Sequence, residues 1–194
     1  WQAAQEDDKR GMGTTCTLAA IRGDQLFLAH IGDSRAYLLR DGELCQISKD
    51  HSWVEDAVYQ GVITREQART HPNRNVITRA IGLEQQPQID TSVMALADGD
   101  LLLLCSDGLN SMIPDGDIHR ILKESPTDAV CGDLIGAANE AGGHDNTTVV
   151  TALLGGALST GPSTQDTLDI QPRLSLGRRV WRFVFRLSFY SFSI

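Results

Sequence analysis

The sequence predicts an α+β fold built on antiparallel strands, and two patterns support this prediction. Between residues 14 and 47, short apolar or alternating runs are separated by turn pairs such as Gly23-Asp24 and Asp41-Gly42, which is typical of hairpins. Between residues 52 and 141, helix-capping residues alternate with two further strand-like runs. With 194 residues, 41% of them apolar, the chain is long enough for one domain with a sizeable core.

The predicted strands are short, and consecutive ones are expected to pair as an antiparallel meander. The run that begins at Leu101 is apolar on both faces, so we place it in the centre of a sheet. Alternation of apolar and polar residues predicts another strand just before this run. The other expected strands cover residues 15–21, 25–31, 35–40, 43–47, 89–96 and 146–154.

The helices are predicted from their start signals. Ser52 and Thr64 each precede, by three residues, an acid or amide that could complete a capping box, so a short helix should follow each of them. Two longer helices are expected over residues 114–123 and 128–141, and Thr127 is a candidate N-cap for the second.

Charge and composition divide the chain into three parts. Residues 1–172 carry all 25 acidic residues against 12 basic ones, whereas residues 173–194 carry five arginines and no acid. An acidic body argues against nucleic acid as the main partner, because phosphate binding needs a cationic surface. We therefore expect a globular part over residues 1–154, a flexible Gly/Ser/Thr/Pro-rich linker over 155–172 and a basic-aromatic tail over 173–194.

The four cysteines form no CxxC pair, which excludes the usual zinc and thioredoxin-type motifs. Cys16 and Cys105 lie in apolar runs and are expected in the core of a protein from a reducing compartment. The five histidines are dispersed without metal-ligand spacing, and His144 is expected in an exposed loop.

Two acids stand where predicted strands end. Asp107 follows the Leu101 run, and Asp145 precedes the last strand. Their oxygen ligands suit Mg2+ or Mn2+, although two carboxylates alone make a poor cage for a cation. The alternative for each acid is an ordinary role in a turn or as a helix cap.

Four short motifs follow one another in order: Gly11-Met12-Gly13-Thr14-Thr15, Gly32-Asp33-Ser34-Arg35, Ser106-Asp107-Gly108 and Gly143-His144-Asp145-Asn146. Each alone occurs in ordinary turns. Together, over about residues 10–154, the set resembles the metal-dependent protein phosphatases of the protein phosphatase 2C type, in particular the bacterial Ser/Thr phosphatases that oppose membrane-bound kinases.

The resemblance implies an α-β-β-α layered sandwich of two mainly antiparallel sheets flanked by helices. In that family two, and in bacterial members up to three, Mn2+ or Mg2+ ions are bound, and a hydroxide bridging two of them attacks the phosphorus of phosphoserine or phosphothreonine. The family also carries an upstream acid pair, an Asp-Gly motif and a phosphate-binding arginine, none of which has a counterpart in residues 1–10. Residues 1–154 are thus expected to be a partial catalytic domain that lacks its N-terminal strands and helix.

The resemblance also implies roles for individual residues. Asp107 and Asp145 match ligands of the first metal, and Asp33 matches an acid that helps bind a weaker third metal together with Asp107. Asn146 and Gly108 lie next to these acids and would support them, Asn146 by orienting the Asp145 carboxylate. For Asp33 a β-turn role stays open.

Arg35 could face the substrate phosphate, but a salt bridge to a nearby acid is the simpler expectation. Residues 50–81 match the family's variable flap, which lies beside the active site and influences which phosphoprotein binds. Trp53, in this segment, is expected to anchor a short helix in the core, with a surface contact role as the alternative.

The expected function is hydrolysis of phosphoserine and phosphothreonine in proteins phosphorylated by bacterial Ser/Thr kinases. This chain by itself is expected to be weak or inactive, because two or three acids do not replace the bridging ligand. The alternative is a non-catalytic module that binds phosphoproteins or kinases. The expected location is the cytoplasm, and the tail, which is too short after Arg186 to span a bilayer, suggests a contact with the inner face of the membrane, either as a truncated anchor or as a surface segment. An artefact at the end of the sequence would look the same.

Overall fold

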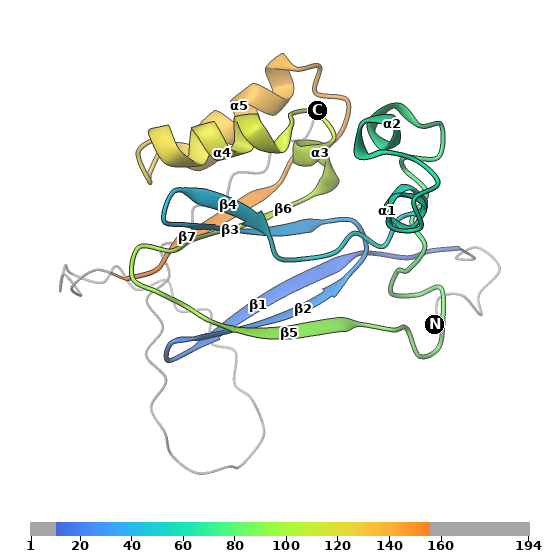
Figure 1. The fold of residues 1–194 in the computed structure, drawn as a ribbon, viewed down its shortest axis with the longest axis horizontal. Coiled ribbons are helices and arrows are strands. Elements are labelled where there is room, and N and C mark those ends of the chain that lie inside the picture. The colour runs from blue at the N-terminus through green and yellow to red at the C-terminus, as the bar shows by residue number, and fades with distance from the viewer. Residues whose placement is uncertain (1–10, 156–194) are drawn as a thin grey trace, which may run out of the picture.

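The computed structural model describes residues 11–155, which form two antiparallel sheets stacked on each other (Figure 1). The smaller sheet has the order β1-β2-β5 and the larger one the order β4-β3-β6-β7. The strands of the smaller sheet are β1 (Cys16–Arg22), β2 (Gln25–Ile31) and β5 (Asp90–Ala95). Those of the larger sheet are β3 (Arg35–Arg40), β4 (Glu43–Gln46), β6 (Leu101–Cys105) and β7 (Val149–Leu153).

The helices lie on one side and at one end of these sheets. Figure 1 shows α4 and α5 across the outer face of the larger sheet, whereas α1 and α2 stand at the end of both sheets, between β4 and β5 in the chain. The helices are α1 (Trp53–Tyr59), α2 (Arg65–Thr70), α3 (Asp107–Asn110), α4 (Asp115–Glu124) and α5 (Val130–Glu140). The predicted class, two antiparallel sheets with flanking helices, is confirmed.

The expected meander is wrong at one point. Strands β2 and β3 do not pair; the chain leaves the smaller sheet after Ile31 and enters the larger one at Arg35. Gly32, with φ +115°, makes the turn between the sheets, a conformation that favours glycine. The β6 strand lies between β3 and β7, as its apolar composition predicts.

The main core lies between the larger sheet and its helices. Tyr37 and Leu103 on the sheet are fully buried against Leu109, Ile118 and Leu134 from α3, α4 and α5. Alternate residues of the same strands face the smaller sheet. The larger sheet is therefore covered on both faces.

The outer face of the smaller sheet differs. Leu18, Phe27 and Val93 are 53%, 37% and 56% exposed. Phe27 pairs with Val93 across β2 and β5, so these side chains form a continuous apolar face. Among the residues that the structure describes, no helix covers this face (Figure 1).

The caps confirm the starts of α1 and α2 and correct that of α5. Thr64 and Gln67 form a reciprocal capping box, whereas Ser52 only accepts a hydrogen bond from the Glu55 amide, because the Glu55 side chain pairs with Arg65. The N-cap of α5 is Ala129 and not Thr127, since a turn from Pro126 precedes the helix.

Two other expectations about buried residues are wrong. Trp53 is 36% exposed and stacks on the His71 ring at 4.6 Å, so it joins α1 to the end of α2 at the surface and is not a core anchor. Cys16 is exposed because it lies on the outer face of β1, whereas Cys105 is buried as expected. His144 is exposed, as expected.

Among residues 11–155, no helix has the length and apolar character needed to cross a bilayer. The predicted tail over 173–194, and all but the first residue of the predicted linker over 155–172, lie outside the described residues.

Candidate metal centre

Strand pairing brings the three predicted acids to one end of the larger sheet. Arg35 pairs with Cys105, so the turn before β3, with Asp33, meets the start of α3 after β6, with Asp107. Cys105 also pairs with Val149, so the loop before β7, with Asp145, comes to the same end. Antiparallel register therefore gathers residues that are more than 100 positions apart in the sequence.

The three carboxylates interact in series. Burial and the negative charge of Asp107 raise the pKa of Asp33 to about 6. Burial and the charge of Asp145 raise the pKa of Asp107 above its ordinary value. Asp107 thus stands between the other two acids, and a cation placed there would relieve the repulsion on both sides.

The two residues predicted to support these acids fix the loops that carry them. A Cβ at Gly108 would lie 2.5 Å from the Asn146 carbonyl oxygen, so only glycine allows the start of α3 to approach the loop this closely. The Asn146 amide donates to Asp145 Oδ1 at 2.7 Å. The backbone of Asn146, rather than its side chain, therefore provides the contact with the Asp145 carboxylate.

Ser106 and Thr147 also hold the start of α3 against the loop before β7, and neither was predicted to do so from the sequence. The Thr147 hydroxyl donates to the Gly108 carbonyl at 3.0 Å, and the Ser106 hydroxyl accepts from the Thr148 amide at 3.0 Å. The sequence signal for these contacts was a hydroxyl residue next to each motif: Ser106 directly before Asp107, and Thr147 directly after Asp145-Asn146.

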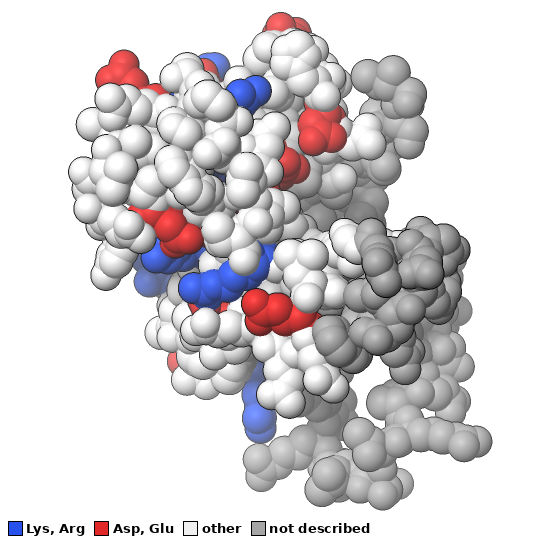
Figure 2. Space-filling view, turned by 90° about the vertical axis from the view of Figure 1, so that its right-hand side faces the viewer, with Lys and Arg blue, Asp and Glu red and all other residues white. Residues whose placement is uncertain are grey.

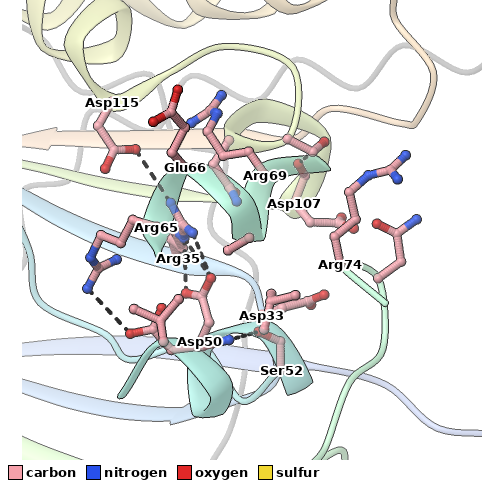
Figure 3. A pocket seen from close by; sticks show the side chains of 17 residues that line it. Asp33, Arg35, Asp50, Ser52, Arg65, Glu66, Arg69, Arg74, Asp107 and Asp115 are labelled. Carbon is pink, nitrogen blue, oxygen red and sulfur yellow. Dashed lines mark hydrogen bonds and ion pairs between the residues drawn. The ribbon is translucent and has the colours of Figure 1, made fainter. Parts of the chain in front are cut away.

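Asp33 and Asp107 line a pocket of about 340 Å3 next to the segment from residue 50 to 81. Figure 3 shows both acids on the same side of this pocket, with Arg74 beside them. Arg65 and Arg69 of α2 also line it. Asp145 lines a separate cavity, together with Asn146 and Thr147. The structure thus places two of the three predicted ligands in one pocket and the third in a neighbouring cavity, close enough for its charge to act on Asp107.

The donor atoms have the right chemistry for a hard divalent cation but form only part of a site. Within residues 11–155, no group of three or more His, Cys, Asp or Glu side chains converges closely enough to hold a metal ion. Carboxylate oxygens in a partly buried, mutually repelling series suit Mg2+ or Mn2+. These residues therefore fit a metal site that needs further ligands.

Arg35 forms a salt bridge, as expected, and does not present a free guanidinium. Its Nε donates to Asp50 Oδ1 at 3.0 Å and to Oδ2 at 2.9 Å, and its Nη2 donates to Oδ2 at 2.7 Å (Figure 3). Its Nη1 donates to the Tyr37 hydroxyl at 2.8 Å. Nη1 also lies 3.4 Å from Asp115. Burial lowers the pKa of Arg35, but the hydrogen bonds to Asp50 prevail and raise it above its ordinary value.

Asp50, Tyr37 and Asp115 were not predicted as parts of this site. Asp50 directly precedes the first predicted helix, and Asp115 lies in the first turn of α4, where acids are common anyway. Tyr37 is two residues from Arg35 on β3, but only the folded chain brings Asp50 and Asp115 to Arg35, since they are 15 and 80 positions away from it.

The end of the molecule that carries α1 and α2 has mixed charge. On this face, acidic and basic side chains of the described residues lie next to one another near the middle of the view (Figure 2). This interleaving differs from the single-sign patch that a phosphate backbone would require.

Comparisons with known proteins agree with this architecture. A family model described as protein phosphatase 2C matches residues 1–151. The serine/threonine phosphatase Stp of Listeria innocua is 42% identical over 149 residues, which is 76% of this chain and 59% of the relative. The chain thus spans about three fifths of the length of this relative.

Solved structures are similar as well. The crystal structure of the Mycobacterium tuberculosis serine/threonine phosphatase PstP/Ppp has a TM-score of 0.73 and 45% identity, covering 80% of this chain and 66% of that one. The catalytic domain of PstP in complex with two manganese ions has a TM-score of 0.68 and 43% identity, covering 77% of this chain and 62% of that one. The chain therefore belongs to the protein phosphatase 2C family.

Proposed function

We propose that the protein hydrolyses phosphoserine and phosphothreonine in other proteins, with Mn2+ or Mg2+ held by Asp107, Asp145 and Asp33. The observation that carries this proposal is the series of three carboxylates, each repelling the next, at one end of the larger sheet. Similarity to serine/threonine phosphatases and to a manganese-bound catalytic domain supports the choice of substrate and metal.

The division of roles follows from the pocket. Bound divalent cations would supply Lewis-acid activation and neutralise the charge of the phosphoryl group. Asp33 and Asp107 would hold cations in the pocket, and Asp145 would act on Asp107 from the neighbouring loop. Arg69 and Arg74, from the segment of residues 50–81, would position the phosphoprotein.

We also propose that this chain alone is a weak catalyst or none. Divalent cations of this kind take about six oxygen ligands, several of them water, and two ions held side by side need more carboxylates than one ion does. Among the described residues, Asp107 interacts with Asp33 and with Asp145, but the three carboxylates do not converge on a single point. Joining the chain to the upstream segment of the Listeria relative would supply the remaining positions in a chimera.

A phosphatase assay tests the proposal. We expect Mn2+-stimulated hydrolysis of p-nitrophenyl phosphate by the chimera, with a loss of about a hundredfold or more in Asp107→Asn and Asp145→Asn. Asp128→Asn, at an exposed position before α5, is the matched control and should keep full activity. Unchanged activity in either site variant would refute the metal assignment.

A non-catalytic role is the second candidate, and the lack of three converging ligands in residues 11–155 favours it. In that case the chain would bind phosphopeptides or a kinase without releasing phosphate. Titration of a phosphothreonine peptide, followed by phosphate release in the same sample, separates the two functions. Binding without release by the chimera would establish the binding module.

The expected cellular partners are Ser/Thr kinases that phosphorylate the substrates, and the basic tail suggests contact with the inner face of the cell membrane. Anionic liposomes test the membrane contact. The full chain should bind them more tightly than a version that ends at Gly155, and equal binding would refute the contact.

A further inference from the structure

The turn that carries Asp33 is unusually constrained. Gly32 is buried and adopts φ +115°, a conformation that favours glycine. A Cβ at this position would overlap the Thr15 side chain. Gly32 therefore sets the direction in which Asp33 leaves the smaller sheet on its way to β3.

Two buried histidines hold both polar groups of Gly32. The Gly32 amide donates to His51 Nδ1 at 3.1 Å, and the Gly32 carbonyl accepts from the His51 amide at 2.7 Å. The same carbonyl accepts from His30 Nε2 at 3.1 Å, and the two rings lie 5.0 Å apart. His30 and His51 are 1% and 2% exposed, so water does not compete for these bonds.

The hydrogen bonds also define the state of the His51 ring. Because Nδ1 accepts from the Gly32 amide, the proton of the neutral ring must lie on Nε2. Nε2 lies 3.1 Å from Asp90 Oδ2 and donates to it, while Asp90 Oδ1 pairs with Arg79 at 3.1 Å. Asp90 thus holds the ring in the tautomer that can accept from Gly32, while Arg79, whose Nη1 lies 3.3 Å from Nε2, pairs with Asp90.

His51 also joins the Gly32 turn to the segment of residues 50–81, which supplies most of the residues that line the pocket. It directly follows Asp50, the partner of Arg35, and its carbonyl accepts from the Thr78 amide at 2.8 Å. Residues at both ends of the 50–81 segment therefore meet at His51.

We propose that His51, held by Asp90, is a positioning residue that fixes the Gly32 turn and so presents the Asp33 carboxylate to Asp107. This inference rests on the proposed function for its consequence, the binding of a divalent cation, but not for the geometry of the turn. His51 acts through the backbone of Gly32, the residue before Asp33.

Two substitutions of His51 separate this role from simple packing. In His51→Asn, the side-chain oxygen takes the place of Nδ1 and can still accept from Gly32, whereas in His51→Gln the amide reaches the place of Nε2 and keeps only the Asp90 partner. Both variants lose the ring, so a packing role predicts similar effects. A positioning role predicts different ones.

Two measurements on the full chain distinguish the effects of His51→Asn and His51→Gln. Hydrogen exchange of the Gly32 amide, followed by NMR, should stay slow in His51→Asn and accelerate about tenfold or more in His51→Gln. The Mn2+ dissociation constant, from the EPR signal of free Mn2+, should change less than about threefold in His51→Asn and rise about tenfold in His51→Gln.

The outcomes are distinct. Equal exchange rates and equal Mn2+ affinities in the two variants overturn the positioning role. If the unmodified chain binds no Mn2+ while the exchange rates differ as expected, the proposed metal function fails and the constraint on the turn stands. If neither His51 variant folds, Asp90→Asn leaves His51 in place and should accelerate Gly32 exchange about threefold; an unchanged rate there overturns the proposal.

Discussion

The two sheets of this molecule differ in how they are covered. The larger sheet has helices α4 and α5 on its outer face, with Leu103 and Tyr37 fully buried there. In the described residues, the smaller sheet leaves Leu18, Phe27 and Val93 exposed on its outer face. Apolar burial contributes about 25 cal/mol per Å2, so stability should reside mainly in the larger sheet. The candidate site lies at the end of that sheet.

The largest effect should come from the covered face. Leu103→Ala removes a fully buried side chain and should reduce the free energy of unfolding by about 3–5 kcal/mol. Phe27 lies on the outer face of the smaller sheet, which we call the bare face. Phe27→Ala should reduce the free energy of unfolding clearly less than Leu103→Ala, although it removes a larger side chain. Urea denaturation of both variants gives the comparison, and equal losses would show that the bare face is covered in solution.

The buried ion pair beside the site should give the next largest effect. Asp50→Ala leaves Arg35 without its main partner, and the side chains of the pair are only 18% and 8% exposed for Arg35 and Asp50. We expect a loss of about 3 kcal/mol in unfolding free energy. Glu124→Ala, which removes an exposed partner of Arg120, is the control and should cost less than about 0.5 kcal/mol.

The repulsion between carboxylates should make one substitution stabilising. The pKa of Asp33 is about 6 in the folded chain, above its ordinary value of 3.8. The folded state therefore binds more protons than the unfolded state between these values, so stability falls as pH rises through this window and the full penalty applies above pH 6. Without metal, Asp33→Asn should raise the unfolding free energy by about 1 kcal/mol at pH 7.5, a figure reduced for partial solvent screening.

The same comparison at low pH provides the check. Well below 3.8, at about pH 3, Asp33 is largely protonated in both states, so most of the advantage of Asp33→Asn should disappear. Thermal melts at both pH values measure this difference. An advantage of equal size at both would show that it does not come from the charge.

The smallest effect is expected on the bare face itself. Val93→Thr keeps the branched shape suited to a strand and exposes no new polar group to the core, so the unfolding free energy should change by less than about 0.5 kcal/mol. The same substitution at the buried Val149 should cost at least about 1 kcal/mol. Similar costs at both positions would mean that something covers Val93.

The sequence predicted most elements because their signals are local. Strands β2 and β3 have the bounds expected from their apolar runs, and the reciprocal capping box of Thr64 and Gln67 is present. It did not predict that β2 and β3 lie in different sheets. Strand pairing depends on long-range packing, and here on the single conformation of Gly32.

The same division holds for the site. From the sequence, the ordered set of motifs and the family that it resembles predicted that Asp33, Asp107 and Asp145 belong to one site. Strand pairing brings the three segments to one end of the larger sheet. Only the tertiary structure decided that Asp107 is the middle acid, that Arg35 is taken by Asp50 and that two distant histidines hold the Gly32 turn. Motifs reflect local backbone requirements, whereas these contacts depend on strand register and burial, which arise only when the segments pack together.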